Sequence, residues 1–160
     1  MKTKNVMAIL ILMCLTLFGC STNSVKEDLL NYSNKELPKI VDLENEVVSG
    51  YEGVSGDNYT DDITMYNALL NEIIPASKKL IEAAEDITPK TKEVREIHEL
   101  YISSINHQNS AFVIILSALE TQDFEKINSA NEKLDLARKE NRDFLQQIKE
   151  LGEKNSVKFN

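Results

Sequence analysis

Four polar residues, Glu44, His98, Asn109 and Asn141, fall on helix faces that are otherwise predicted to be apolar. A carboxylate, an imidazole and two amides can bind a small ligand between helices. They can also form internal hydrogen bonds that fix how the helices align, because a buried polar group needs a partner. We favour internal hydrogen bonds and keep a ligand site between the helices as the alternative.

Arrangements that would indicate catalysis or metal binding are missing from the sequence. A di-iron site in a helical bundle needs Glu-x-x-His, but Arg95 and Ser104 stand three residues before His98 and His107. These two histidines fall on opposite helix faces, which disfavours zinc. The sequence has no G-x-S-x-G and no glycine-rich phosphate loop. We therefore expect no enzyme activity, no catalytic residue, no metal site and no cofactor.

Apolar residues recur with helical periodicity in four successive segments, about 26–49, 60–87, 88–119 and 122–153. Short connections between amphipathic helices of this length predict an all-α fold, an antiparallel up-down four-helix bundle over residues 26–160. Pro38 and Pro75 fall inside the first two helices, where a missing N–H should kink them. We expect the last helix to fray beyond Glu153.

Local signals predict where the helices begin. Three glycines between positions 50 and 56 indicate a loop, and Thr60-Asp61-Asp62 contains a candidate N-cap for the second helix. This loop lacks the ligand spacing of an EF-hand, so we interpret it as a plain connection. Thr88 as cap and Pro89 as first residue would begin the third helix.

The third and fourth helices should form a hairpin that turns near Thr121. Facing residues would then have numbers that add up to about 242. This register places Tyr101 opposite Asn141, and we expect the two side chains to form a hydrogen-bonded pair.

The first twenty residues have the organisation of a bacterial export signal. Lys2 and Lys4 precede an uncharged apolar run, residues 6–18. The run is shorter than the roughly 20 residues that span a bilayer, and it suits the core of a signal peptide. It ends in Leu17-Phe18-Gly19-Cys20 instead of an A-x-A-like site.

This ending resembles the lipobox of bacterial lipoproteins. The resemblance implies that cleavage between Gly19 and Cys20 removes residues 1–19. It also implies that the Cys20 sulfur carries a diacylglyceryl group, with palmitate-like chains. Two acyl chains are enough for stable anchoring, so we expect a protein held on the extracytoplasmic side of the cell membrane, with residues 20–25 as a tether. The other cysteine, Cys14, would be removed, which leaves no disulfide.

The sequence is acidic, with a formal net charge of −8, and loss of residues 1–19 would also remove two lysines. An acidic chain without a basic stripe is unsuited to binding nucleic acid. Anionic lipid headgroups would repel it as well. We interpret the acidity as a source of solubility and of separation from the membrane surface.

The region after the lipobox resembles small uncharacterised lipoproteins of low-GC Gram-positive bacteria, through residues 58–62, 97–101 and 108–112. The resemblance implies no established activity. The sequence favours a non-enzymatic module that binds another protein of the cell envelope. The alternative is a lipoprotein that binds or senses a small ligand between its helices.

Overall fold

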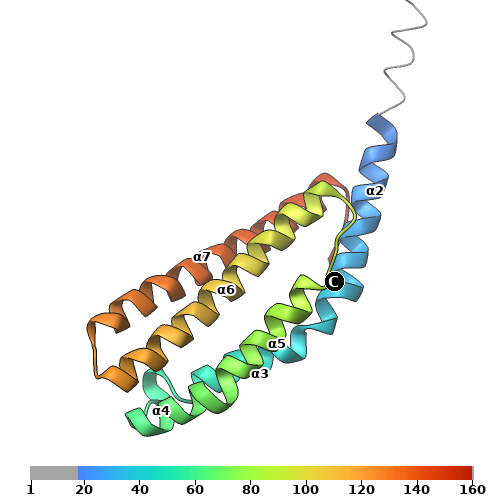
Figure 1. Ribbon diagram of the computed structural model, residues 1–160. Coiled ribbons are helices and arrows are strands. Elements are labelled where there is room, and N and C mark those ends of the chain that lie inside the picture. The colour runs from blue at the N-terminus through green and yellow to red at the C-terminus, as the bar shows by residue number, and fades with distance from the viewer. Residues whose placement is uncertain (1–17, 160) are drawn as a thin grey trace, which may run out of the picture.

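The computed structural model describes residues 18–159, and every regular element in this range is helical. The predicted all-α class is therefore confirmed for the described part of the chain. The predicted signal peptide lies outside the described residues except for its last two positions. Figure 1 shows two long helices side by side, with a second group of shorter helical segments packed along them.

The two long helices are α6 (Lys92–Thr121) and α7 (Glu125–Lys154), and they share the most extensive interface in the described chain. They run antiparallel around a turn at Gln122, which takes a left-handed conformation with φ of 54°. The Ser104 hydroxyl donates to the Ala137 carbonyl at 2.8 Å, and the Ser103 hydroxyl donates to Glu140 at 2.9 Å. These contacts confirm the register predicted for the hairpin.

The first group of segments follows one interrupted path. Helix α2 (Phe18–Asn31) continues through a π-helical turn, η1 (Tyr32–Glu36), and a 3-10 turn, η2 (Leu37–Lys39), into α3 (Val41–Glu52). Pro38 lies at the start of the 3-10 turn, so the predicted interruption is present. Residues 20–25, expected to form a tether, lie within α2, and Val25 is buried against the rest of the protein.

The next group is also interrupted by a π-helical turn. Helix α4 (Asp62–Ala68) leads through η4 (Leu69–Ile73) into α5 (Ile74–Glu85). Asp61 is the N-cap of α4, because its carboxylate accepts the Thr64 N–H at 2.9 Å. The cap is therefore one residue after Thr60, with which the predicted start signal begins. The wider π turn directly precedes Pro75, which lies in the first turn of α5, where its missing N–H is tolerated.

Helix α6 begins later than predicted. Thr88 and Pro89 lie in an irregular segment, and Thr91 is the residue that precedes the helix. Asp28 of α2 accepts both the backbone N–H and the hydroxyl of Thr91, each at 2.7 Å. A carboxylate from a distant helix thus binds the start of α6, and this tertiary contact overrides the local Thr-Pro signal.

The C-terminal residues fold back on α7 instead of fraying. The Val157 N–H donates to the Gly152 carbonyl at 2.8 Å, and the Val157 side chain is buried. The Phe159 ring lies so close to Gly152 that a Cβ at this position would come within 2.4 Å of it. A short 3-10 turn, η3 (Gly56–Asn58), completes the described elements, in the loop between α3 and α4.

The core runs along the faces that the apolar periodicity predicts. Its most buried side chains include Leu29, Tyr32, Leu69, Leu80 and Phe112. Five residues of the predicted apolar faces are exposed instead: Val41, Val48, Leu70, Phe124 and Leu145. Phe124 is the most exposed of them, at 75%, because it lies just before α7 at the hairpin turn.

The packing of α3 creates the space for a site. Helix α5 packs on α6, and α3 packs on α5 and η4. Within the described chain, the backbone of α3 does not pack closely on α6 or α7. The side chains between α3 and the hairpin therefore surround an internal space.

Candidate functional site

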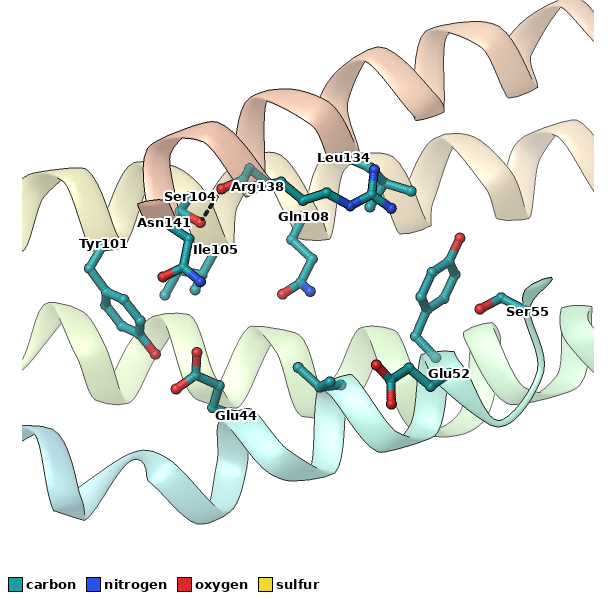
Figure 2. Close-up of a pocket in the computed structure, with 13 residues that line it drawn as sticks. Glu44, Glu52, Ser55, Tyr101, Ser104, Ile105, Gln108, Leu134, Arg138 and Asn141 are labelled. Carbon is teal, nitrogen blue, oxygen red and sulfur yellow. Dashed lines mark hydrogen bonds between the residues drawn. The ribbon is translucent and has the colours of Figure 1, made fainter. Parts of the chain in front are cut away.

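A cavity of about 290 Å³ lies between α3, α6 and α7. Figure 2 shows side chains from all three helices converging on it. Its volume is at the lower end of the range for small-molecule sites. The residues that line it are Glu44, Val48, Tyr51, Glu52, Ser55, Tyr101, Ser104, Ile105, Gln108, Leu134, Ala137, Arg138 and Asn141.

One end of the cavity is formed by Tyr101 and Glu44. The Tyr101 side chain is only 3% exposed, and its hydroxyl makes no hydrogen bond of ordinary geometry with the described residues. Figure 2 shows this hydroxyl directed towards the Glu44 carboxylate. Burial raises the pKa of Glu44, an effect that the Tyr101 hydroxyl partly offsets. Burial and the Glu44 charge both raise the pKa of Tyr101.

Asn141 projects from α7 towards the same end (Figure 2). The predicted Tyr101–Asn141 hydrogen bond is wrong, since the Tyr101 hydroxyl has no partner. The tyrosine ring packs against Phe144 and His98, which directs its hydroxyl across the cavity towards α3. The predicted register is correct, but the two side chains face a shared space instead of each other.

The other end of the cavity is more exposed and carries charges of both signs. The Arg138 guanidinium binds Asp135 at 2.8 Å, and both side chains are largely exposed. Glu52 of α3 also lies at this end (Figure 2), and Tyr51, the residue before it, lines the same cavity. Burial raises the pKa of Tyr51, and the charge of Arg138 acts in the opposite direction. In Figure 2 the guanidinium lies far along the cavity from Glu44.

The structure brings together two of the four predicted residues. Glu44 and Asn141 line the cavity, whereas His98 and Asn109 do not. Sequence reasoning did not include Glu52 and Arg138. Their spacing could have identified them. Glu52 is about two helical turns after Glu44, and Arg138 is about one turn before Asn141, so each lies on the same helix face as a predicted residue.

His98 is a core residue whose ring nitrogens both have partners. Its Nε2 donates to the Ala84 carbonyl at 3.0 Å, and its Nδ1 accepts from the Tyr32 hydroxyl at 2.9 Å. Burial lowers the pKa of His98, and the neutral imidazole fits these two contacts. This histidine joins α6 to the end of α5 and to η1.

Asn109 and His107 lie outside the cavity. The side-chain oxygen of Asn109, Oδ1, is buried without a hydrogen-bond partner in the described chain. His107 contacts Glu140 of α7 through Nδ1 at 2.7 Å, and Glu140 also accepts from Ser103. These contacts join α6 to α7 on a face away from α3.

A second concave surface, the distal groove, lies near the turn between α6 and α7. Its volume is about 230 Å³ and its lining is mainly apolar. The groove is lined by Tyr51, Tyr59, Asp62, Met65, Ile115, Ala118, Leu119, Gln122, Phe124, Ile127 and Asn131. Figure 1 shows that α4 and this turn lie at the opposite end of the molecule from the start of α2.

The distal groove combines exposed apolar side chains with an acidic surrounding. Phe124 is 75% exposed and Ile63, in the neighbouring helix α4, is 74% exposed. The sequence has no lysine, arginine or histidine in residues 40–77 or 108–125, the stretches that form most of this end. Asp57, Asp61 and Asp123 lie in the surrounding loops.

Residues 18–159 contain neither a membrane-spanning helix nor a metal-binding cluster. None of the helices in residues 18–159 is both long enough and apolar enough to cross a membrane. The same residues contain no group of three or more histidine, cysteine, aspartate and glutamate side chains that could hold a metal ion.

Gly19 and Cys20 lie in the first turn of α2. Comparison of the chain with known protein families, with curated proteins and with solved structures finds no match. The cavity, the distal groove and the amino-terminal sequence are therefore the features of the protein that bear on its function.

Proposed function

We propose that this protein is a lipoprotein that binds another protein of the cell envelope through its distal groove. In this proposal Cys20 carries the diacylglyceryl anchor on the extracytoplasmic face of the cell membrane, and the helices form an antiparallel up-down four-helix bundle. The two pairs of helical segments and the antiparallel register of α6 and α7 support this topology.

The observation that carries the proposal is the exposure of Phe124 and Tyr59, which both line an apolar groove, together with the exposure of Ile63, which follows the lining residue Asp62 in α4. Isolated exposed apolar residues are common, but large ones that gather at a concave surface mark interaction sites. The groove lies at the far end of the molecule from the start of α2, which contains Cys20 (Figure 1). An anchored protein would therefore present it away from the membrane.

Charge defines the chemistry of the partner. The long stretches without basic residues and the aspartates around the groove give this end an excess of negative charge, although Lys126 adds a positive charge at the turn, where it donates to Ser117 and Thr121. A complementary partner would be a segment with lysine or arginine residues flanking an aromatic or aliphatic side chain. Opposite charges would steer the encounter, and burial of the apolar side chains would hold the complex.

A photocrosslinking experiment in intact cells tests the groove. Benzoylphenylalanine placed at position 124 should give one discrete protein adduct, and the same group at Leu145 should not, because Leu145 is exposed but does not line the groove. The Phe124 adduct should diminish in an Ile63→Glu background and at high salt. Adducts of equal yield and identity from both positions would contradict the proposal.

Membrane anchoring has a separate test. Cys20→Ser should prevent acylation and move the protein from the membrane fraction to the soluble fraction. A Cys14→Ser variant is the matched control and should stay with the membrane. If Cys20→Ser still fractionates with membranes, the lipoprotein part of the proposal is wrong, whatever the groove binds.

A further inference from the structure

The cavity between α3, α6 and α7 contains a buried polar group that the protein itself satisfies poorly. The Tyr101 hydroxyl is almost completely buried and makes no hydrogen bond of ordinary geometry within the described residues, although it faces the Glu44 carboxylate closely enough to shift the pKa of that group. A buried polar group without a well-placed partner is destabilising. The hydroxyl is directed into the cavity (Figure 2), so an occupant of the cavity can remove this destabilisation.

Glu44 specifies the charge of that occupant. Its carboxylate lies beside the Tyr101 hydroxyl, and burial disfavours its charged form. Arg138 is the one described lining residue with a permanent positive charge, but it is bound to Asp135 at the opposite, exposed end. The half-buried Glu44 carboxylate therefore has no cation beside it among the described lining residues. An anionic ligand at this end would be repelled.

The number of acceptors matches a particular cation. Glu44 from α3, Tyr101 from α6 and Asn141 from α7 each bring an oxygen atom to one end of the cavity. A primary ammonium group has three N–H donors, one for each of these oxygens. A metal ion would have a single charged ligand here, because Glu44 supplies the one carboxylate among these three oxygen donors.

Part of the remaining wall is apolar and accommodates an uncharged carbon chain. Val48 of α3, Ile105 of α6, and Leu134 and Ala137 of α7 line the cavity, with Ile105 near the Glu44 end and Leu134 near the Arg138 guanidinium (Figure 2). A ligand with an ammonium group and a short aliphatic stem would place the charge at Glu44 and the stem against these side chains. The cavity volume of about 290 Å³ restricts the ligand to a small molecule.

We propose that this cavity binds a small organic ammonium ion, with the nitrogen held by Glu44, Tyr101 and Asn141. The ammonium group donates to the carboxylate, the phenol oxygen and the amide oxygen, and its stem covers Val48 and Ile105. This site adjoins the protein-binding groove, with which it shares Tyr51, and its existence does not depend on Cys20 acylation.

The test is an NMR titration of the full-length ¹⁵N-labelled protein in detergent micelles with n-butylammonium chloride. Its neutral and anionic counterparts, 1-butanol and butyrate, serve as comparison probes. The side-chain amide signals of Asn141 and Gln108 should shift with butylammonium, and Asn141→Leu assigns the first of them. Butanol and butyrate should produce much smaller shifts.

Variants localise the binding. Glu44→Gln keeps the size of the side chain and should weaken butylammonium binding by at least about tenfold, as expected for a lost charge-assisted hydrogen bond. Tyr101→Phe should weaken it by a smaller factor. Glu46→Gln is the matched control, because Glu46 is exposed on α3 and does not line the cavity. Circular dichroism establishes that each variant is folded.

The pH dependence separates Glu44 from its neighbours. Affinity should rise with pH as Glu44 ionises, while Tyr101 on α6 stays protonated and Arg138 on α7 stays charged. Glu52 lies on the same helix as Glu44, so the titration is repeated with Glu52→Gln. The pH dependence of the affinity should remain in this variant, which excludes Glu52 as its source. The proposal is overturned if butylammonium causes no shift, if butanol shifts the same signals equally, or if Glu44→Gln and Glu46→Gln bind alike.

Discussion

The carboxylate of Asp28 accepts two hydrogen bonds from Thr91, one from the backbone N–H and one from the hydroxyl, each at 2.7 Å. The two residues are 63 positions apart, and Asp28 is only 5% exposed. The contact joins the first described helix, α2, to the start of the longest interface in the protein. It therefore couples the amino-terminal helix to the α6–α7 hairpin.

Asp28→Ala should lower the free energy of unfolding by about 2–3 kcal/mol, since it leaves the Thr91 N–H and hydroxyl without their partner. Urea denaturation followed by circular dichroism measures the change. Glu27→Ala is the control, because Glu27 is exposed on the same helix and bonds only to Asn23 among the described contacts. Equal losses in the two variants would show that the carboxylate does not secure α6.

Tyr32→Phe should destabilise the protein by about 1–2 kcal/mol, because it removes the hydroxyl that donates to Nδ1 of the buried His98. Tyr59→Phe is the matched control. Its hydroxyl bonds to Asp62 at an exposed position, so its loss should be nearly neutral. Thermal unfolding of the two variants in parallel makes the comparison, and similar melting temperatures would contradict a role for the Tyr32–His98 contact.

Acid should destabilise the protein through His98. Burial lowers the pKa of His98 in the folded state, so the unfolded chain binds a proton more readily. The neutral imidazole contributes its full share of the free energy of unfolding above the unfolded-state pKa of about 6.5. This share is lost as the pH falls from about 6.5 towards the lower folded-state pKa of His98. Denaturation midpoints between pH 8 and pH 5 test this, and His98→Gln should flatten this part of the profile.

Glu44→Gln should stabilise the unliganded protein at neutral pH. Burial raises the folded-state pKa of Glu44. The stabilising free energy of the protonated side chain is therefore fully present below the unfolded pKa and is lost as pH rises through the folded pKa. A glutamine side chain has the same size and does not ionise, so the variant does not lose this free energy. Chemical denaturation at pH 5 and pH 8 should show a larger benefit at pH 8. A destabilised variant would indicate that the carboxylate has a partner inside the protein.

Gly152→Ala should detach the C-terminal residues from α7. The new methyl group would come within 2.4 Å of the Phe159 ring, and this ring is exposed enough to move away. The global free energy of unfolding should fall by less than about 1 kcal/mol, since terminal contacts are only locally stabilising. Hydrogen exchange at the Val157 amide should become faster. Phe159→Ala should have the same effect alone, and the two changes together should not add.

The sequence predicted features that depend on one helix or on neighbouring helices. The apolar periodicity of residues 97–119 and 124–148 places Ile105, Phe112 and Leu134 in the core, and the short turn sets the hairpin register. The Asp61 cap was predictable because a carboxylate three residues before an N–H is a local arrangement.

Features that depend on distant contacts were not predictable. Thr91 begins α6 because Asp28 reaches it from another helix, and no periodicity in residues 86–92 reports that contact. Val157 is buried only because the chain reverses after Gly152. The cavity arises from the separation of α3 from the hairpin, which polar positions alone do not determine.

Tyr51 belongs to the wall of both concave surfaces, because its side chain lines the cavity and the distal groove. Its ring also packs against Phe112 in the core, with the ring centres 4.8 Å apart. A movement of this ring would change both surfaces at once. If each surface binds its own partner, the two affinities are thermodynamically linked, and the effect of one occupant on the other must be equal in both directions.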